Sequence, residues 1–243
     1  LQTRDEFLSA ITHDLRSPLT SVRGFAQLMR RGFETRERLE PQRMAAWLST
    51  IESSTDRMAA MINELLDLAQ LRDGRPLHLN PKRMDLVALA RQLAQEQQPS
   101  REHHRLAVKA GSGEIWGVWD PVRIARVVTN LFSNALKYSP DGGTVQVFLR
   151  VCPEGAAKMA WAEMEVRDEG VGIPAQDLSR IFDRFQRGTN VGGIGGLGIG
   201  LAAARQIVEQ HGGTLSAESE LGRGSVFVLR LPLAGTPQDI ARL

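Results

Sequence analysis

A histidine beside a carboxylate lies near the start of the chain, where His13 precedes Asp14 in the stretch THDLRSPLT. A neutral imidazole attacks through one ring nitrogen while the other keeps its proton, and a neighbouring carboxylate can hold that N–H and stabilise the developing charge. Ser17 follows one helical turn later, on the same face. The pattern predicts a nucleophilic histidine. The alternative is a surface histidine with an acidic neighbour by chance, because a single His-Asp pair has low specificity.

A second group of polar side chains is spaced for one side of a helix: Asn130, Asn134, Lys137 and Tyr138 in the stretch NLFSNALKY. Asparagine is a poor residue for a helix interior, so its repetition in register with a lysine needs a reason. Amide oxygens can coordinate a hard divalent cation, and an ammonium group can hold a phosphate beside it. A plain polar outer face is the alternative.

Two glycine-containing stretches extend this pattern. In DEGVGIP, Asp168 follows a predicted strand, and Gly170 and Gly172 allow the backbone to approach a ligand. The carboxylate can accept a hydrogen bond from an exocyclic amine such as that of adenine. The run GGIGGLGIG (192–200) fits the dinucleotide fingerprint, but the polar stretch IFDRFQRGTNV precedes it where a strand is needed. We therefore interpret the run as a lid that ends at a helix N-terminus suited to a phosphate.

Two long heptad patterns must position His13. With Leu8 at position a, His13 falls at the solvent-facing position f, and Pro18 should bend the helix one turn later. This helix is predicted to run to about residue 31 and end at Gly32. A second heptad pattern runs from Met44 to Ala69. The two helices predict an antiparallel hairpin that dimerises into a four-helix bundle, and the alternative is a monomeric hairpin packed on the rest of the chain.

The remaining sequence predicts a two-layer α+β sandwich. Strands are expected at 105–110, 144–151, 159–167 and 225–233, and helices at 85–98, 121–138 and 198–211. The second and third strands should form a hairpin. The predicted division is a helical hairpin at 1–72, a linker at 73–82, a sandwich domain at 83–234 and a tail at 235–243.

Composition narrows the function classes. Thirty Lys and Arg against 28 Asp and Glu give a formal charge of +2, which offers no case for nucleic acid or an anionic membrane. The single cysteine, Cys152, excludes an intramolecular disulfide and fits a reducing compartment. No membrane span or signal peptide is evident, and the chain begins with Leu1. We expect a cytoplasmic piece of a longer protein, without membrane contact in this fragment.

Taken together, the motifs resemble those of bacterial sensor histidine kinases of two-component systems. THDLRSPLT resembles the H box of that family, NLFSNALKYSP its N box, DEGVGIP its G1 box, IFDRFQRG its F box, GGLGIGL its G2 box and GRGSVFVLRLP its final glycine motif. The match covers nearly the whole chain in the family's order. The resemblance implies a dimerisation and phosphotransfer hairpin followed by the ATP-binding fold that gyrase, Hsp90 and MutL share.

By this resemblance, ATP with Mg²⁺ phosphorylates His13, and the phosphoryl group then passes to an aspartate in the receiver domain of a response regulator. Asp14 would be the orienting base. The implied nucleotide contacts are Asn134 and Asn130 to Mg²⁺, Lys137 to the phosphates, Tyr138 to the wall of the site, Asp168 to the adenine amine and Arg187 to the γ-phosphate, together with Gly170, Gly172, Gly196, Gly198, Gly200 and Leu201.

The chain departs from the family pattern at three motif positions. Asp14 stands where Glu is more usual, Ser17 where Thr or Asn is more usual, and Leu197 where a small hydroxyl residue is common. The change at Ser17 puts phosphatase activity toward the regulator in doubt. Two rival functions stay open at this point: an ATPase of the gyrase and Hsp90 type that phosphorylates no histidine, and a non-catalytic dimeric adaptor that binds a regulator.

Overall fold

The structure is a computed structural model, and the protein divides into two compact units, Leu1–Ala69 and Gln70–Leu243. The described residues are 18–32, 34, 40–71, 78–98, 104–111, 113–153, 160–186, 188–191 and 198–233, with side chains left out at 56, 57 and 59–71. None of the described helices is long and apolar enough to cross a membrane. The three boundaries between the four segments expected from the sequence stay predictions.

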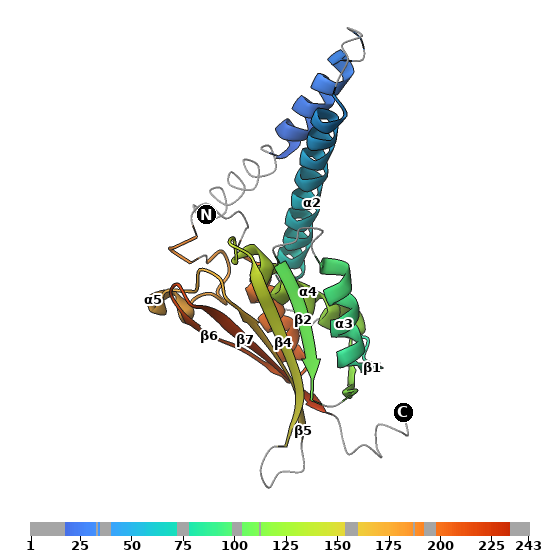
Figure 1. Cartoon of the computed structure of the whole chain (residues 1–243). Helices are drawn as coiled ribbons and strands as arrows, with labels where there is room; N and C mark the ends of the chain where they lie inside the picture. The colour runs from blue at the N-terminus through green and yellow to red at the C-terminus, as the bar shows by residue number, and fades with distance from the viewer. Residues whose placement is uncertain are drawn as a thin grey trace. The chain divides into compact units, whose positions relative to one another are not determined.

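The first unit contains the two helical segments that the heptad patterns predict. Residues 18–32 are helical, and α2 spans Pro41–Leu71 (Figure 1). The helix was expected to end at Gly32, and this was wrong, because Gly32 and Glu34 are both helical. An ion pair of 3.6 Å from Arg30 to Glu34 bridges the turn that contains the glycine, which offsets part of the roughly 1 kcal/mol that a helical glycine costs. The predicted bend before Pro18 lies outside the described residues.

The second unit is built on a five-stranded sheet of order β2-β4-β5-β7-β6, in which only the β2–β4 pairing is parallel. Its elements are β1 (Lys82–Asp85), α3 (Leu86–Gln97), β2 (His104–Ala110), β3 (Trp116–Trp119), α4 (Pro121–Lys137), β4 (Gly143–Pro153), β5 (Ala160–Asp168), α5 (Ala175–Leu178), α6 (Gly200–Gln210), β6 (Thr214–Glu220) and β7 (Gly224–Leu233). The predicted hairpin is confirmed as the antiparallel pair of β4 and β5.

Helices α3, α4 and α6 pack on one face of this sheet (Figure 1). Alternate residues of the central strands point to that face, and Val147 of β4, Met164 of β5 and Leu229 of β7 are fully buried there. Leu131 and Phe132 of α4 are also fully buried. The apolar face of α4 is therefore held against the sheet, and its polar edge is left for other contacts. The predicted two-layer α+β fold is confirmed.

A capping residue fixes the start of α4, the helix that carries the polar side chains. Asp120 accepts hydrogen bonds from the backbone N–H groups of Val122 (3.0 Å) and Arg123 (3.1 Å), and Pro121 occupies the first turn of α4. Burial alone would raise the pKa of Asp120, but the backbone N–H groups of Asn80, Arg123 and Val122 together lower it. These contacts start α4 at the position that the sequence predicts.

Four elements were not expected from the sequence: β1, β3, α5 and β6. The first three are only four residues long, which is too short for a periodic pattern. Strand β6 has the polar sequence TLSAESE and lies at the edge of the sheet, paired only with β7. Its inward-facing residues are Leu215, Ala217 and Ser219, an apolar alternation too weak to predict a strand, so the pairing with β7 decides its conformation.

Candidate functional site

The polar edge of α4 carries a preformed pair of amides. The Nδ2 group of Asn134 donates a hydrogen bond of 3.1 Å to Oδ1 of Asn130, one helical turn earlier. Both side chains are half-buried. This bond uses one N–H of Asn134 and leaves its amide oxygen as an acceptor for a ligand.

The last turn of α4 brings a cation and an aromatic ring to the same end of the helix. The Nζ atom of Lys137 lies 5.0 Å from the centre of the Tyr138 ring, a cation–π distance that keeps the ammonium group beside the ring. Tyr138 caps the helix, and its backbone N–H bonds to the carbonyl of Asn134 at 2.9 Å. Lys137 and Tyr138 therefore follow the amide pair directly along the same edge.

The loop after β5 packs tightly on this helix end. The N–H of Val171 donates to the carbonyl of Tyr138 at 2.9 Å. A Cβ atom on Gly170 would lie 2.1 Å from that carbonyl oxygen, and one on Gly172 would lie 2.1 Å from the carbonyl oxygen of Glu220. Gly172 also has a φ of +67°, which L-residues with side chains rarely adopt. Both glycines are thus required by close backbone approach.

Asp168 ends β5 and is buried, with 4% of the residue's surface exposed. Its Oδ1 atom accepts two backbone hydrogen bonds, from Gly170 at 2.9 Å and from Ser225 at 3.1 Å. Burial raises the pKa of Asp168, and these two bonds oppose the rise only in part. Since both bonds go to Oδ1, Oδ2 is the oxygen left to accept a bond from a ligand.

The N-terminus of α6 meets the amide pair. A Cβ atom on Gly200, the first residue of α6, would lie 2.1 Å from Nδ2 of Asn130. None of the described side chains caps this end of the helix, and the first backbone N–H groups of a helix have no intrahelical partner. Such an end binds anions, and phosphate in particular. The contact places an anion-binding helix end beside two amides suited to a cation.

A second glycine fixes the approach to α6. Gly198 has a φ of +69°, its carbonyl accepts a bond of 2.9 Å from the N–H of Phe185, and a Cβ atom there would lie 2.6 Å from the carbonyl oxygen of Gln186. Ile199 is fully buried and Leu201 packs partly buried against the core. The turn before α6 is therefore fixed by a backbone hydrogen bond at Gly198, by the burial of Ile199 and by the packing of Leu201 against the core.

The structure thus brings together most of the described residues that the sequence singled out. Asn130 contacts both Asn134 and Gly200. Tyr138, Gly170 and Asp168 form a second contiguous set, joined to the first through the last turn of α4. Five predicted site residues lie outside the described residues: His13, Asp14, Ser17, Arg187 and Gly196.

Sequence reasoning assigned no role to three residues that support this site. Gly224 has a φ of +92°, and a Cβ atom on it would lie 2.1 Å from the carbonyl oxygen of Asp168. Asn190 donates from Nδ2 to the carbonyl of Gly172 at 2.9 Å. Phe185 has a positive φ of 66° without being glycine. The second glycine of GRGSVFVLRLP was the available signal for Gly224. Asn190 and Phe185 depend on tertiary contacts that no local pattern reveals.

A cation at this site would depend on amide oxygens and on the ligand. Within the described ranges, no group of three or more His, Cys, Asp or Glu side chains could hold a metal ion. Mg²⁺ commonly takes only one or two protein ligands and completes its octahedron with water and substrate phosphates. The two amides beside the N-terminus of α6 fit that arrangement.

Comparisons with known proteins agree with this geometry. Residues 3–74 match the His Kinase A (phospho-acceptor) domain, and residues 119–235 match the family described as Histidine kinase-, DNA gyrase B-, and HSP90-like ATPase. The chain is 31% identical over 241 residues to the sensor histidine kinase WalK of Bacillus subtilis, a match that covers 98% of this chain and 38% of WalK. It is 34% identical over 245 residues to the circadian input-output histidine kinase CikA of Synechococcus elongatus, covering 94% of this chain and 30% of CikA.

Among solved structures, full-length ShkA in complex with AMPPNP has the same fold, with a TM-score of 0.63 and 25% identity over 95% of this chain and 46% of ShkA. The chain spans less than half the length of each of these relatives. The two matched domains occur in the order of the H box and the nucleotide-binding motifs. The chain belongs to the family of two-component sensor histidine kinases.

Proposed function

We propose that this protein binds ATP with Mg²⁺ along the edge of α4 and transfers the γ-phosphoryl group to His13. The observation that carries the proposal is the contact between Asn130, which is bonded to Asn134, and Gly200 at the start of α6. A nucleoside triphosphate needs an anion-binding helix end and cation ligands side by side. Here the two features touch.

Each end of the nucleotide then has a partner. The amide oxygens of Asn134 and Asn130 hold Mg²⁺, and the N-terminus of α6, with Gly196 and Gly198 before it, receives the phosphates. Lys137 neutralises phosphate charge, and Arg187 reaches the γ-phosphate. The Oδ2 atom of Asp168 accepts a hydrogen bond from the adenine amino group, and the ring of Tyr138 forms part of the wall. Bound Mg²⁺ would neutralise the charge on the phosphate oxygens.

Catalysis of phosphoryl transfer depends mainly on positioning the nucleophile and the phosphates and on stabilising the charge of the transition state. A ring nitrogen of His13 forms a bond to the γ-phosphorus while the bond to the β–γ bridging oxygen breaks, and ADP leaves. Asp14 holds the proton on the other ring nitrogen and stabilises the imidazolium charge. The phosphohistidine then transfers the group to an aspartate oxygen of a response regulator receiver domain. We place the reaction in the cytoplasm, where ATP is supplied.

A homodimer is part of the proposal. Among the described side chains of the helical segments, three leucines are exposed in the single chain: Leu19 at 54%, Leu28 at 46% and Leu48 at 47%. Helical hairpins with such apolar side chains commonly pair into four-helix bundles. Ser17 would orient the water that hydrolyses the regulator's phosphoaspartate, and the loss of the methyl group of threonine makes this activity weak.

The test is incubation of the protein with Mg²⁺ and ATP labelled at either the γ- or the α-phosphorus. The proposal predicts covalent label from γ-labelled ATP alone, lost in acid and kept in base. Nucleotide binding without covalent label would instead favour an ATPase that phosphorylates no histidine. Absence of nucleotide binding would favour a non-catalytic adaptor.

A further inference from the structure

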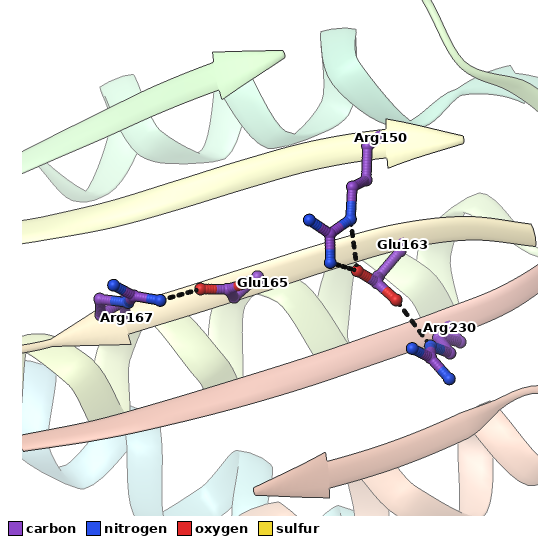
Figure 2. A network of polar contacts seen from close by, with 5 residues as sticks. All are labelled: Arg150, Glu163, Glu165, Arg167 and Arg230. Atoms are coloured by element: carbon purple, nitrogen blue, oxygen red, sulfur yellow. Dashed lines mark hydrogen bonds and ion pairs between the residues drawn. The ribbon is translucent and has the colours of Figure 1, made fainter. Parts of the chain in front are cut away.

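The face of the sheet opposite the helices carries a buried carboxylate that no proposed step uses. Glu163 of β5 has a side chain only 1% exposed, and it lies between Arg150 of β4 and Arg230 of β7 (Figure 2). Arg150 bonds to Oε1 through Nε at 2.7 Å and also through Nη2, and Arg230 bonds to Oε2 through Nε at 2.6 Å. The strand register places the three residues directly opposite one another.

Among the described residues, this cluster carries one more positive than negative charge, since two guanidinium groups share one carboxylate. The two arginine side chains are 60% and 54% exposed. Within the described part of the chain, Arg230 bonds to Glu163 through Nε alone, so its Nη groups remain as donors. Figure 2 shows a single dashed line between the Glu163 carboxylate and Arg230. A buried ion pair seldom adds net stability over apolar packing, whereas a fixed guanidinium is suited to recognition of a planar anion.

A cavity of about 260 Å³ lies at this arginine. It is lined by Cys152, Pro153, Trp161, Thr214 and Arg230. Thr214 is the cross-strand neighbour of Arg230, and Trp161 is the neighbour of Pro232 in the same sheet. An apolar cavity of about 150 Å³ can hold benzene, so this volume accommodates a small ring together with a charged group. The cavity combines an aromatic and proline wall with one oriented cation.

We propose that this cavity binds a small organic carboxylate, with the carboxylate on the guanidinium of Arg230 and the carbon body against Trp161 and Pro153. The net positive charge of the Arg150–Glu163–Arg230 cluster matches a monoanion, and the planar fork of arginine matches a carboxylate. The apolar walls favour a ligand with a carbon body over inorganic phosphate. The cavity is at the opposite end of β5 from Asp168, so it is separate from the nucleotide site.

Cys152 supplies a direct readout, because it lines the cavity and is the only cysteine in the sequence. The experiment measures the rate at which N-ethylmaleimide, a neutral reagent, labels Cys152 in the intact chain with benzoate, with benzamide or with inorganic phosphate. Benzoate at ten times its Kd should slow labelling by about tenfold. Benzamide, which has the same shape without the charge, and phosphate should leave the rate unchanged.

Two matched variants test whether the guanidinium of Arg230 is the group that binds the carboxylate. Arg230→Gln should remove the protection by benzoate, while Glu163 keeps its bonds to Arg150. Arg167→Gln should retain the protection by benzoate. Arg167 lies on the same strand face but outside the cavity, where it pairs with Glu165 at 2.8 Å (Figure 2). Thermal unfolding checks that both variants fold.

Three results would overturn the proposal. The first is equal slowing by benzoate and by benzamide or phosphate. The second is no slowing by benzoate up to about 10 mM, ten times a millimolar Kd. The third is protection retained in folded Arg230→Gln. The comparison of benzoate with benzamide on the unmodified protein decides the matter even if Arg230→Gln fails to fold.

Discussion

Asn134 acts in the structure as a hydrogen-bond donor to Asn130, and this defines what a substitution there would do. In Asn134→Asp, a carboxylate replaces the donor and faces the Oδ1 acceptor at the present distance of 3.1 Å. The pair is lost, and a negative charge is added beside the proposed phosphates. In calorimetric titrations, we expect the Mg²⁺-dependent affinity for ATP to fall roughly tenfold or more. The circular dichroism spectrum of the variant should match that of the unmodified protein, because the change does not affect folding.

Ser133→Asp is the matched control, because it adds the same charge one residue earlier at an exposed position of α4. Its ATP affinity should stay near that of the unmodified protein. A similar loss in both variants would mean that general charge repulsion, and not the amide pair, explains the effect.

At Asp168 the structure predicts opposite effects on binding and on stability. Burial raises the pKa of its carboxyl group above the ordinary value of 3.8, so the ionised form costs folding free energy at pH 7 and protonation in acid removes that cost. Asp168→Asn should therefore leave the free energy of unfolding at pH 7 unchanged or higher. The same change should weaken ATP binding roughly 10- to 100-fold, since a hydrogen bond to a charged acceptor is lost.

The pH dependence gives a second check on Asp168. In the unmodified protein, ATP affinity should fall as the pH drops from 7 through the raised pKa, because only the ionised carboxylate is a pure acceptor. The exposed neighbour Glu169, changed to Gln, should leave both binding and its pH profile unaltered. An Asp168→Asn protein that binds ATP normally would rule out the assigned contact with adenine.

At the scale of the elements, the start of α6 leaves no room for a Cβ atom. In Gly200→Ala the new Cβ atom would meet Nδ2 of Asn130 at 2.1 Å, so the asparagine must move or the helix must shift. Alanine is the better helix former, and the variant should fold. We expect its ATP affinity to fall roughly tenfold, from a strain of about 1–3 kcal/mol.

Gly113→Ala controls for the substitution itself, because nothing lies within 4 Å of its Cβ position. Titration with ATP should not distinguish Gly113→Ala from the unmodified protein. Unchanged affinity in Gly200→Ala would show that the contact between α6 and Asn130 is not part of the nucleotide site.

Strands β4, β5 and β7 are tied together by Glu163, and this link depends on pH. Burial alone would raise the pKa of Glu163, but Arg230 and Arg150 together lower it below the ordinary value of 4.5. A lowered carboxyl pKa gives stability that is present above 4.5 and is lost as the pH falls through the folded-state value. The free energy of unfolding should therefore drop more steeply below pH 4.5 in the unmodified protein than in Glu163→Gln.

Glu165→Gln is the comparison, since Glu165 is on the same strand face but pairs with one arginine, Arg167. Denaturant unfolding at a series of pH values measures all three proteins. If Glu163→Gln and the unmodified protein lose stability in parallel below pH 4.5, the two arginines do not stabilise the buried carboxylate.

At the scale of the whole molecule, the sequence predicted the elements that carry their own periodicity. Strands β4, β5 and β7 alternate apolar and polar residues, and α4 has both a capping aspartate and an apolar face. Strand β6 could not be predicted because its TLSAESE sequence is polar and pairing with β7 decides its conformation. The helical state of Gly32 was likewise set by its context and not by the intrinsic preference of glycine.

The parts of the site that depend on local spacing could be predicted from the sequence, and the contacts between elements could not. The spacing of Asn130 and Asn134 places them on one helix edge, and the structure has them hydrogen-bonded. Their contact with Gly200 could not be read from any local pattern, since it depends on how α4 and α6 pack. The role of Ser225, whose backbone N–H fixes Asp168, was hidden for the same reason.

The central claim is that the nucleotide bound by the second unit phosphorylates His13 in the first. The most direct measurement maps the phosphoryl group by mass spectrometry under neutral conditions after incubation with ATP and Mg²⁺, on the unmodified protein and on His13→Gln, with an ATP titration of both. We predict phosphorylation at His13 alone, none in His13→Gln, and equal ATP affinity in the two proteins. Phosphorylation that persists in His13→Gln, or that maps to another residue of the unmodified protein, would contradict the account.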